Sequence, residues 1–434
     1  MWQLMSSRWL YHAATIILIL AKINVICCFS PNVRKVGVVR SNHDSIVRRK
    51  MSDNNNNSGG ASIDAGALGS ALVRLDREWQ KNPGALVAKG SAPGTSTWKK
   101  LPLERDSDEF VYLLEPPFST SPSVLICFTG GAVLGQFPHI AYSEMLQEIS
   151  KRLNASIIAA PYQVTNLDHF ALAKQTGELL RKGIITCQDT KLYGEDIPKF
   201  FVGHSLGCKL QTISLAATGI GADFSGIGYI SFNNFGFTDT IGMAKSFAKE
   251  FQQNQSPSSF SQPDGMMDML FEFAEQAMGM VGLEFTPSPN DTNRIISMKY
   301  DADLQSKTRL FVFDEDDLDN SVDFVNACNS QQSSSSSSSL EVSGLDGNHL
   351  TPVYLKLNID DFDIPDEAQY VVSDFTNNVQ QVSFGDVDKM KAAADEVCDW
   401  ILGKSPTRPP IWNKSQKRKY NYESTRRIEP GIES

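Results

Sequence analysis

Hydrophobic residues in the middle of the chain form short runs that alternate with segments of helical periodicity. Val124–Phe128 is apolar without interruption, which is typical of a strand buried on both faces of a sheet. Further strand-like runs are Ser156–Ala160, Phe200–Val202, Ile227–Phe232, Arg309–Phe313 and Leu340–Val342. Helical spacing occurs at Tyr142–Leu153, Asp168–Arg181, Cys208–Ala217 and Val387–Leu402. This alternation predicts an α/β domain with a mostly parallel central sheet and helices on both faces.

The composition outside these runs sets the boundaries that we expect for the domain, residues 61–404. Four consecutive Asn lie within 53–60, a segment too polar to bury a core, which indicates a disordered linker. Residues 333–339 are all Ser and predict a loop. Residues 405–434 are rich in Pro, Lys and Arg and are expected to form a disordered basic tail.

The segment at 238–300 is too long for a plain connection between two strands, and five of the twelve Met residues of the chain lie within its residues 266–280. Methionine is a flexible filler of adaptable apolar surfaces, so we expect a mobile helical cap over a site. Met269 and Phe273 are candidates to line that site. The alternative is an amphipathic helix packed permanently on the domain.

The first sixty residues have the composition of a targeting segment. Residues 1–28 contain an apolar run, Ala13–Cys28, broken only by Lys22, which suits the core of a signal peptide better than a membrane span. After Phe29 the chain is basic and poor in acids, as transit peptides are. The combination resembles the bipartite presequence of algae with complex plastids, and it predicts a transit peptide and linker over 29–60. The alternative is an uncleaved amphipathic anchor.

Charge narrows the classes of partner. The first fifty residues hold eight Lys and Arg and one acid, which leaves 32 basic and 49 acidic residues in the remainder, a net charge of -17. Nucleic-acid binding needs clustered cations to displace phosphate counterions, so we expect no nucleic-acid partner. The basic tail leaves open a peripheral contact with anionic lipid. The sequence gives no basis for an oligomeric state.

Ser205 is the candidate nucleophile, within Gly203-His204-Ser205-Leu206-Gly207. A G-x-S-x-G string is common by chance, so its context decides its meaning. In a nucleophile elbow the serine lies on a strained turn between a buried strand and a helix. Phe200–Val202 and Cys208–Ala217 supply both flanks. Since a serine hydroxyl is a poor nucleophile at neutral pH, it also requires a base and an acid.

His349 is the candidate base by elimination. His12 and His43 lie in the presequence, and His139 and His169 precede Ser205, against the Ser–acid–His order of the fold. His204 adjoins Ser205 on the elbow, where neighbouring side chains point apart. His349 follows an apolar segment in a glycine-containing loop, where the base is expected. The alternative is a structural histidine bonded to backbone.

The acid is expected directly after the strand Arg309–Phe313, where five carboxylates crowd into residues 314–319. A carboxylate there would hold the imidazole in the required tautomer. We favour Asp316, with Asp319 as the alternative.

An oxyanion hole needs backbone N–H donors. We expect Leu206 to supply one, and Gly131 or Ala132, in the loop after Val124–Phe128, to supply the other, although a plain strand-to-helix turn is the alternative there. His204, Asn233 and Asn234 are further candidates to line a substrate pocket. Glycine-rich phosphate loops and the HExxH metal motif are absent from the sequence, so we expect neither a cofactor nor a metal.

Several blocks together resemble the domain-of-unknown-function 1350 family of cyanobacteria and plastid-bearing eukaryotes. They are the Gly130–Ala132 loop, Gly203–Gly207, Phe232–Asn234, Glu284–Pro289, Asp316–Asp319 and Gly347–Pro352. The resemblance spans about residues 100–400 and implies an α/β-hydrolase-like fold. By matching position it places the family's serine and histidine on Ser205 and His349, and two aspartates three apart on Asp316 and Asp319.

Two functions are therefore expected. The first is a plastid serine hydrolase of the esterase, thioesterase or lipase kind, acting on a small-molecule or lipid acyl substrate through a Ser205 acyl-enzyme. The second is a non-catalytic descendant of the fold that serves as a binding or assembly factor in the plastid, because fold alone does not fix function.

Overall fold

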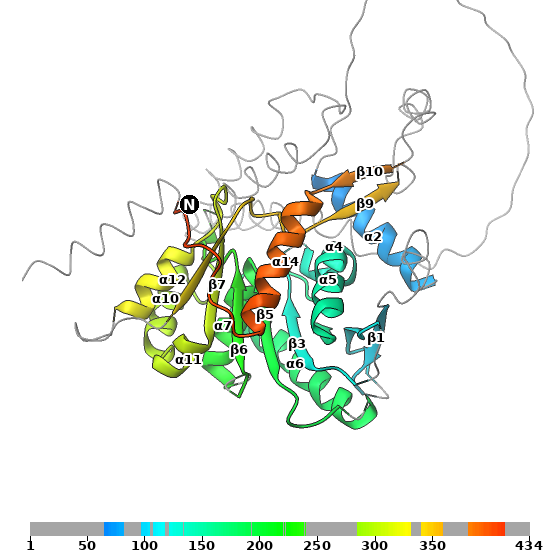
Figure 1. Ribbon diagram of the computed structural model, residues 1–434, viewed down its shortest axis with the longest axis horizontal. Coiled ribbons are helices and arrows are strands. Elements are labelled where there is room, and N and C mark those ends of the chain that lie inside the picture. Colours follow the sequence, from blue (N-terminus) through cyan, green and yellow to red (C-terminus); the bar gives the residue numbers. More distant parts are fainter. Residues whose placement is uncertain are drawn as a thin grey trace, which may run out of the picture. The chain divides into compact units, whose positions relative to one another are not determined.

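The computed structural model of the chain contains an eight-stranded sheet in the order β1-β2-β4-β3-β5-β6-β7-β8 (Figure 1). β2 pairs antiparallel with both of its neighbours, β1 and β4, and the strands from β3 to β8 pair in parallel with one another. The strands are β1 (Trp98–Pro102), β2 (Phe110–Leu114), β3 (Val124–Thr129), β4 (Ala155–Ala159), β5 (Lys199–His204), β6 (Gly226–Ile230), β7 (Thr308–Phe313) and β8 (Glu341–Leu345). This is the sheet of an α/β-hydrolase, so the predicted fold class is confirmed.

The structure describes residues 65–81, 97–104, 107–117, 121–132, 134–191, 193–219, 221, 223–237, 239, 284–330, 340–358 and 381–412. The expected presequence and linker (1–60) and the poly-Ser loop (333–339) lie outside these residues. Most of the described chain thus belongs to the α/β domain itself.

Two helical layers cover the sheet because the side chains of each buried strand alternate between its faces. Val124, Ile126 and Phe128 of β3 belong to one hydrophobic cluster, whereas Leu125 and Cys127 belong to another. On the first face lie α5 (Ser143–Leu153) and α14 (Val387–Ile401). On the second lie α6 (His169–Lys191), α7 (Leu206–Thr218), α10 (Pro289–Lys299) and α12 (Ser321–Asn329). The predicted strands are therefore buried on both sides, except for Leu340–Val342 at the start of the edge strand β8, which is partly exposed.

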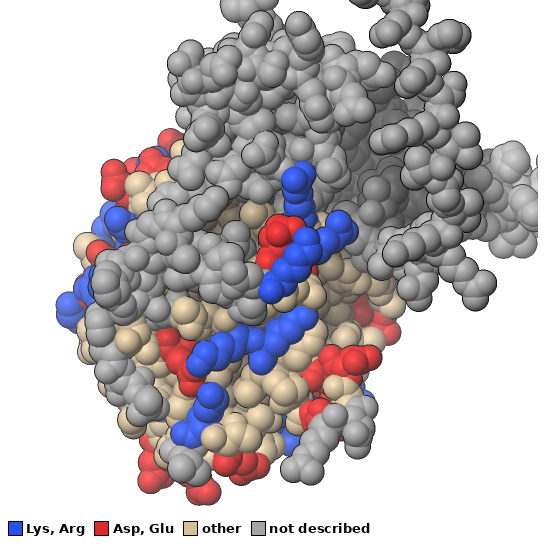
Figure 2. Space-filling view, turned by 90° about the vertical axis from the view of Figure 1, so that its right-hand side faces the viewer, with Lys and Arg blue, Asp and Glu red and all other residues tan. Residues whose placement is uncertain are grey.

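The remaining described elements complete the domain. They are α2 (Ala65–Lys81), the 3-10 helix η1 (Leu134–Gln136), α4 (Pro138–Ala141), α11 (Ala302–Lys307), and a two-stranded antiparallel sheet of β9 (Leu355–Asn358) and β10 (Gln381–Phe384). Among the helices that the structure describes, none has the length and apolar composition needed to cross a bilayer. On the face shown in Figure 2, Lys and Arg side chains lie interspersed with Asp and Glu side chains.

The predicted end of the cap insertion, at residue 300, was wrong. Residues 289–299 form α10, which begins at a capping box made by Ser288 and Asp291. Ile296 is fully buried, and the hydroxyls of Tyr300 and Tyr229 of β6 lie 2.7 Å apart. Because α10 buries an apolar face against the helices on the sheet, it belongs to the domain body. Residues 240–283, including the candidates Met269 and Phe273, lie outside the described part of the chain.

The predicted tail boundary at residue 405 was also wrong. Arg408 pairs with Asp314 at 2.7 Å, and its backbone carbonyl accepts a hydrogen bond of 2.9 Å from the amide of Gly344 in β8. The amide of Thr407 donates to Glu396 of α14. A basic, proline-rich composition suggested a solvated segment, but it could not show that the chain continues to pack on the domain as far as Trp412.

Candidate functional site

Ser205 lies at the turn between β5 and α7 with φ 56° and ψ -125°. A residue other than glycine pays about 1–3 kcal/mol for such a backbone conformation, and it persists only where the surroundings enforce it. Here the Ser205 amide donates a hydrogen bond of 3.0 Å to the carbonyl of Ile230 in β6. The strand, turn and helix expected from the sequence are therefore present, with Ser205 at the turn.

The two glycines of the motif let the helix pass close to the sheet. A Cβ at position 207 would overlap the carbonyl oxygens of Thr129 and Gly130. A Cβ at position 203 would lie 2.9 Å from the side-chain oxygen of Gln211 and 3.0 Å from the backbone of Cys208. Both positions need glycine because a side chain would force α7 away from β3 and β5.

His349 reaches Ser205 from the loop after β8. Its Nε2 lies 2.9 Å from Ser205 Oγ, and its side chain is buried. The loop is held by its own polar residues, since the amide of Asn348 donates to Thr351 and the amide of Leu350 donates to Asn348. The elimination of five other histidines thus selected a residue that the fold brings to the serine.

Asp316 holds the other ring nitrogen of His349. Its carboxylate oxygens lie 2.9 and 3.1 Å from His349 Nδ1. A carboxylate only accepts, so Nδ1 carries the proton and Nε2 is free to accept one from Ser205. Burial raises the pKa of Asp316, but the charge of His349 and the hydrogen bond to its ring lower this pKa by more, so the net shift is downward. The buried acid is therefore ionised at neutral pH.

Asp319, the alternative acid, has a different role in the structure. Its Oδ1 accepts hydrogen bonds from the amide and hydroxyl of Ser321, at 2.8 and 2.6 Å, at the start of α12. Burial and the nearby charge of Asp316 raise the pKa of Asp319 to about 8. Of the two aspartates, Asp316 contacts the imidazole, and Asp319 supports the turn that carries Asp316 into α12.

Two backbone amides remain as candidate oxyanion donors. Leu206 supplies the first amide of α7, which has no acceptor within the helix. The amide of Ala132 has no acceptor among the described residues. The amide of Gly131, by contrast, donates 2.8 Å to the hydroxyl of Tyr142, so the prediction of Gly131 as a donor was wrong. Gly131 still lies beside Ser205, since a Cβ there would be 3.3 Å from Ser205 Cβ.

His204, predicted as a pocket residue, instead joins two loops of the site. Its Nδ1 lies 2.8 Å from Tyr142 Oη and its Nε2 lies 2.9 Å from the carbonyl oxygen of His349. Since a carbonyl only accepts, Nε2 donates, and Nδ1 accepts from Tyr142, whose oxygen accepts from Gly131. Burial, followed by repulsion from His349, lowers the pKa of His204 to about 3, so this ring is neutral.

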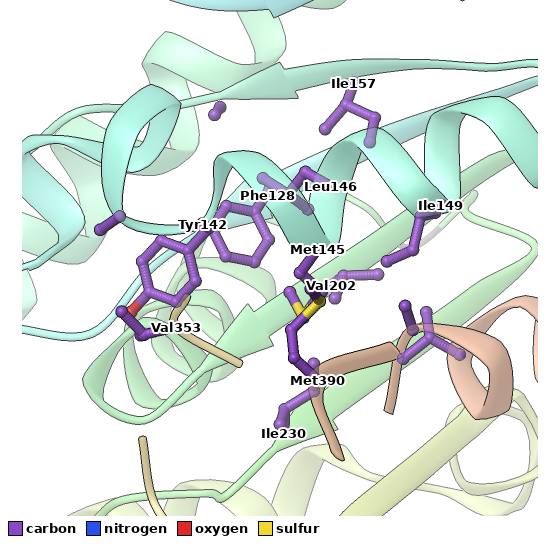
Figure 3. Close-up of a cluster of buried hydrophobic side chains, with 14 of the residues drawn as sticks. Phe128, Tyr142, Met145, Leu146, Ile149, Ile157, Val202, Ile230, Val353 and Met390 are labelled. Atoms are coloured by element: carbon purple, nitrogen blue, oxygen red, sulfur yellow. The ribbon is translucent and has the colours of Figure 1, made fainter. Parts of the chain in front are cut away.

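Tyr142 is a site residue that sequence reasoning missed. Its ring is fully buried and packs edge-on against Phe128, with centroids 4.9 Å apart. Figure 3 shows the ring inside the hydrophobic cluster with its hydroxyl at the end near Val353. A tyrosine at the start of a helix looks like an ordinary core residue. Only the packing shows that its hydroxyl bridges the Gly131 loop and His204.

Asn233 and Asn234 also prove to be structural. The side-chain amide of Asn234 donates 3.0 Å to the carbonyl of Pro289 and to Asn293, and its backbone amide donates to Asn320. Asn233 lies within reach of the Leu318 carbonyl. Both residues fasten the end of β6 to α10 and to the acidic loop. Among the described residues, no cluster of three or more His, Cys, Asp or Glu is placed to hold a metal ion.

Comparison with known proteins places this chain in a family. The search of curated proteins finds no match. Solved structures that are similar include an esterase of Pyrococcus furiosus, at 11% identity and a TM-score of 0.35 over 65% of this chain and 90% of that one. One of two fungal esterases of Rhizomucor miehei has 12% identity and a TM-score of 0.38 over 79% and 100% of the two chains.

The esterase domain of a Rhodothermus marinus protein is also similar, at 14% identity and a TM-score of 0.31 over 64% and 97% of the two chains. The family whose description is "Protein of unknown function (DUF1350)" matches residues 112–369, more than half of the chain. The match includes Ser205, Asp316 and His349 and the strands that carry them. This chain is a member of the DUF1350 family.

Proposed function

We propose that this protein is a serine hydrolase that cleaves an ester or thioester of a small-molecule or lipid acyl substrate. The observation that carries the proposal is the continuous hydrogen-bonded chain from Ser205 through His349 to Asp316, on a strained elbow. Side chains in this order, with all three buried, match the roles of nucleophile, base and orienting acid.

The proposed reaction uses each of these side chains in turn. Ser205 Oγ attacks the carbonyl carbon while its proton passes to His349 Nε2, and the developing imidazolium is stabilised by ionised Asp316. The amides of Leu206 and Ala132 are proposed to stabilise the tetrahedral oxyanion. His349 then donates the proton to the departing alcohol or thiol, which leaves an acyl-enzyme. Water, deprotonated by His349, attacks the acyl carbon, and the same proton returns to Ser205 as the carboxylic acid departs.

Hydrolysis of p-nitrophenyl hexanoate tests this proposal. We expect turnover by the wild-type protein and a loss on the order of 10⁴-fold or more in kcat for Ser205→Ala, because removing the nucleophile leaves only binding and the oxyanion hole. Folding of the variant is checked by its circular dichroism and Tm. Equal rates for both proteins, or no turnover by folded wild type across a set of ester and thioester chain lengths, would favour the non-catalytic binding or assembly factor.

We further propose that the protein acts in a plastid. The basis is the apolar core, Phe29 and basic stretch of residues 1–60. A fluorescent protein fused after residue 60 should enter the plastid, and replacement of Phe29 by Ala should retain it outside. Plastid import that does not need residues 1–60 would contradict this part of the proposal.

A further inference from the structure

A second group of buried polar side chains lies near the nucleophile and has no part in the proposed reaction. Lys209 of α7 is one helical turn after Ser205 and only 1% exposed, and its Nζ has no hydrogen-bond partner among the described residues. His169, the first residue of α6, is 3% exposed, and neither ring nitrogen has a partner in the same part of the chain. Both side chains therefore keep unused hydrogen-bonding capacity in the interior.

The ring of Phe285 links these two residues. His169 stacks on this ring with centroids 4.1 Å apart, and Lys209 Nζ lies 5.8 Å from its centroid. The segment that carries Phe285 is fixed to the start of α6 by two backbone hydrogen bonds. The amide of Phe170 donates to the carbonyl of Thr286, and the amide of Thr286 donates to the carbonyl of Leu167. The ammonium of Lys209 on α7 and the imidazole of His169 on α6 thus both lie against the ring of Phe285.

The nearby acid does not neutralise Lys209. Glu284 raises the pKa of Lys209 through its charge, but its hydrogen bonds go elsewhere. Glu284 Oε1 accepts hydrogen bonds from the amides of Phe237 and Phe285, at 2.8 and 2.7 Å. Burial outweighs this effect and lowers the pKa of Lys209 to about 8, so the amine is still mostly protonated at neutral pH. Burial and repulsion from Lys209 lower the pKa of His169 to about 3. The cluster is one cation beside a neutral N–H donor.

A buried ammonium without a partner is unfavourable for folding, and an apolar side chain of similar size would be tolerated better. Structure alone therefore gives no reason for a lysine at this position. A bound anion would give one, because it would accept hydrogen bonds from both Lys209 Nζ and the His169 ring. The N-terminus of α7, one turn away, adds its favourable dipole for negative charge.

We propose that Lys209 and His169 form a subsite for an anionic oxygen group, a carboxylate or phosphate, carried by the acyl substrate. The role of the subsite in hydrolysis rests on the proposed function, whereas its binding of an anion does not. It narrows the substrate class to esters or thioesters that bear a negative charge beyond the scissile bond.

The kinetic test compares p-nitrophenyl hydrogen adipate, which ends in a carboxylate, with p-nitrophenyl hexanoate. For the wild-type protein we expect a ratio of kcat/KM values of about ten or more in favour of the anionic ester, since charge-assisted hydrogen bonds are the strong ones. In Lys209→Met this ratio should fall towards one. Lys174→Met, which removes an exposed cation from α6, is the matched control and should keep the wild-type ratio. A wild-type ratio near one would overturn the subsite.

The binding test needs no turnover. Calorimetry of Ser205→Ala should detect adipate or inorganic phosphate, and affinity should fall at least tenfold in Ser205→Ala/Lys209→Met and in Ser205→Ala/His169→Phe. Tighter binding of one anion identifies the group recognised. Anion binding without ester hydrolysis would leave the subsite in place and defeat the proposed function. Ester hydrolysis with no anion binding to Ser205→Ala would overturn the subsite alone, even if the Lys209 variants do not fold.

Discussion

Two clusters of buried titratable side chains flank the start of α7, and they differ in how their hydrogen bonds are satisfied. In the Ser205–His349–Asp316 cluster, both nitrogens of His349 contact partners at 2.9 Å. In the Lys209–His169 cluster, neither the amine nor the imidazole has a hydrogen-bond partner within the part of the chain that the structure describes. A satisfied buried network is stable by itself, whereas unsatisfied buried groups lower stability. This difference is consistent with the roles proposed above, in which the first cluster reacts and the second receives a ligand.

The largest expected effect separates the two aspartates of the satisfied cluster. Asp316→Asn should reduce kcat on the order of 10³- to 10⁴-fold, because an amide favours the wrong tautomer of His349. Asp319→Asn, the matched control, keeps an acceptor for Ser321 and should reduce kcat less than tenfold. Steady-state kinetics on an ester substrate measure both. A larger loss in Asp319→Asn would move the acid to the alternative residue.

The unsatisfied cluster should reveal itself in stability. A pKa of about 8 for Lys209, against about 10.5 in the unfolded chain, means that the folded state gives up this proton first. The unfolded state binds more protons between these pH values, so this residue destabilises the protein below pH 8 and ceases to do so as pH rises to 10.5. The penalty amounts to about 3 kcal/mol.

Lys209→Met should therefore raise the free energy of unfolding at pH 7, and its advantage over wild type should shrink towards pH 10.5. Urea unfolding of both proteins across this range measures the difference, in which the shared titration of buried Tyr and Cys cancels. A variant that is several kcal/mol less stable than wild type at pH 7 would show that Lys209 is structural, and it would remove the contrast between the clusters.

A smaller effect is expected from the bridge that holds the loops of the satisfied cluster. Tyr142→Phe leaves the Gly131 amide and His204 Nδ1 without their shared partner, which costs about 1–3 kcal/mol of stability. We expect kcat to fall about tenfold with KM little changed, since the bridge positions the oxyanion loop and the carbonyl of His349. Loss of stability with unchanged kcat would reduce Tyr142 to a core residue.

The last comparison concerns pH and Asp319. Its pKa, raised to about 8 beside Asp316, lies above that of an unfolded aspartate, so the folded state holds the proton through neutral pH. The stability from this group is present below about pH 4 and is lost as pH rises towards 8. Asp319→Asn should accordingly unfold less readily than wild type at pH 8, and this gain should diminish at pH 5. If the difference in the free energy of unfolding between Asp319→Asn and wild type were the same at pH 5 and pH 8, Asp319 would be ionised in the folded protein at both pH values.

The sequence predicted those parts of the site that depend on chain order. Ser205 follows a buried strand and precedes a helix, and His349 is the eligible histidine after it, so periodicity and order sufficed. The choice between Asp316 and Asp319 depended on which carboxylate turns towards the imidazole, which spacing does not encode. The family resemblance placed both at matching positions and left that choice open.

Residues whose role depends on contacts across the fold were misjudged or missed. His204 was assigned to a pocket because of its place beside Ser205, but its partners lie on α4–α5 and the loop after β8. Tyr142 gave no signal in a hydrophobic pattern. Lys209 has no distinguishing feature in the sequence, and only its burial in the structure sets it apart. The packing of 405–412 could not be seen in a basic composition.

The central claim is that Ser205 is an activated nucleophile, and labelling by a fluorophosphonate probe tests it most directly. The folded wild-type protein should take up one equivalent, mapped to Ser205 by peptide mass spectrometry, and His349→Ala should label far more slowly because the serine loses its base. Labelling should be absent in Ser205→Ala. Folded wild-type protein that remains unlabelled at Ser205 would contradict the account.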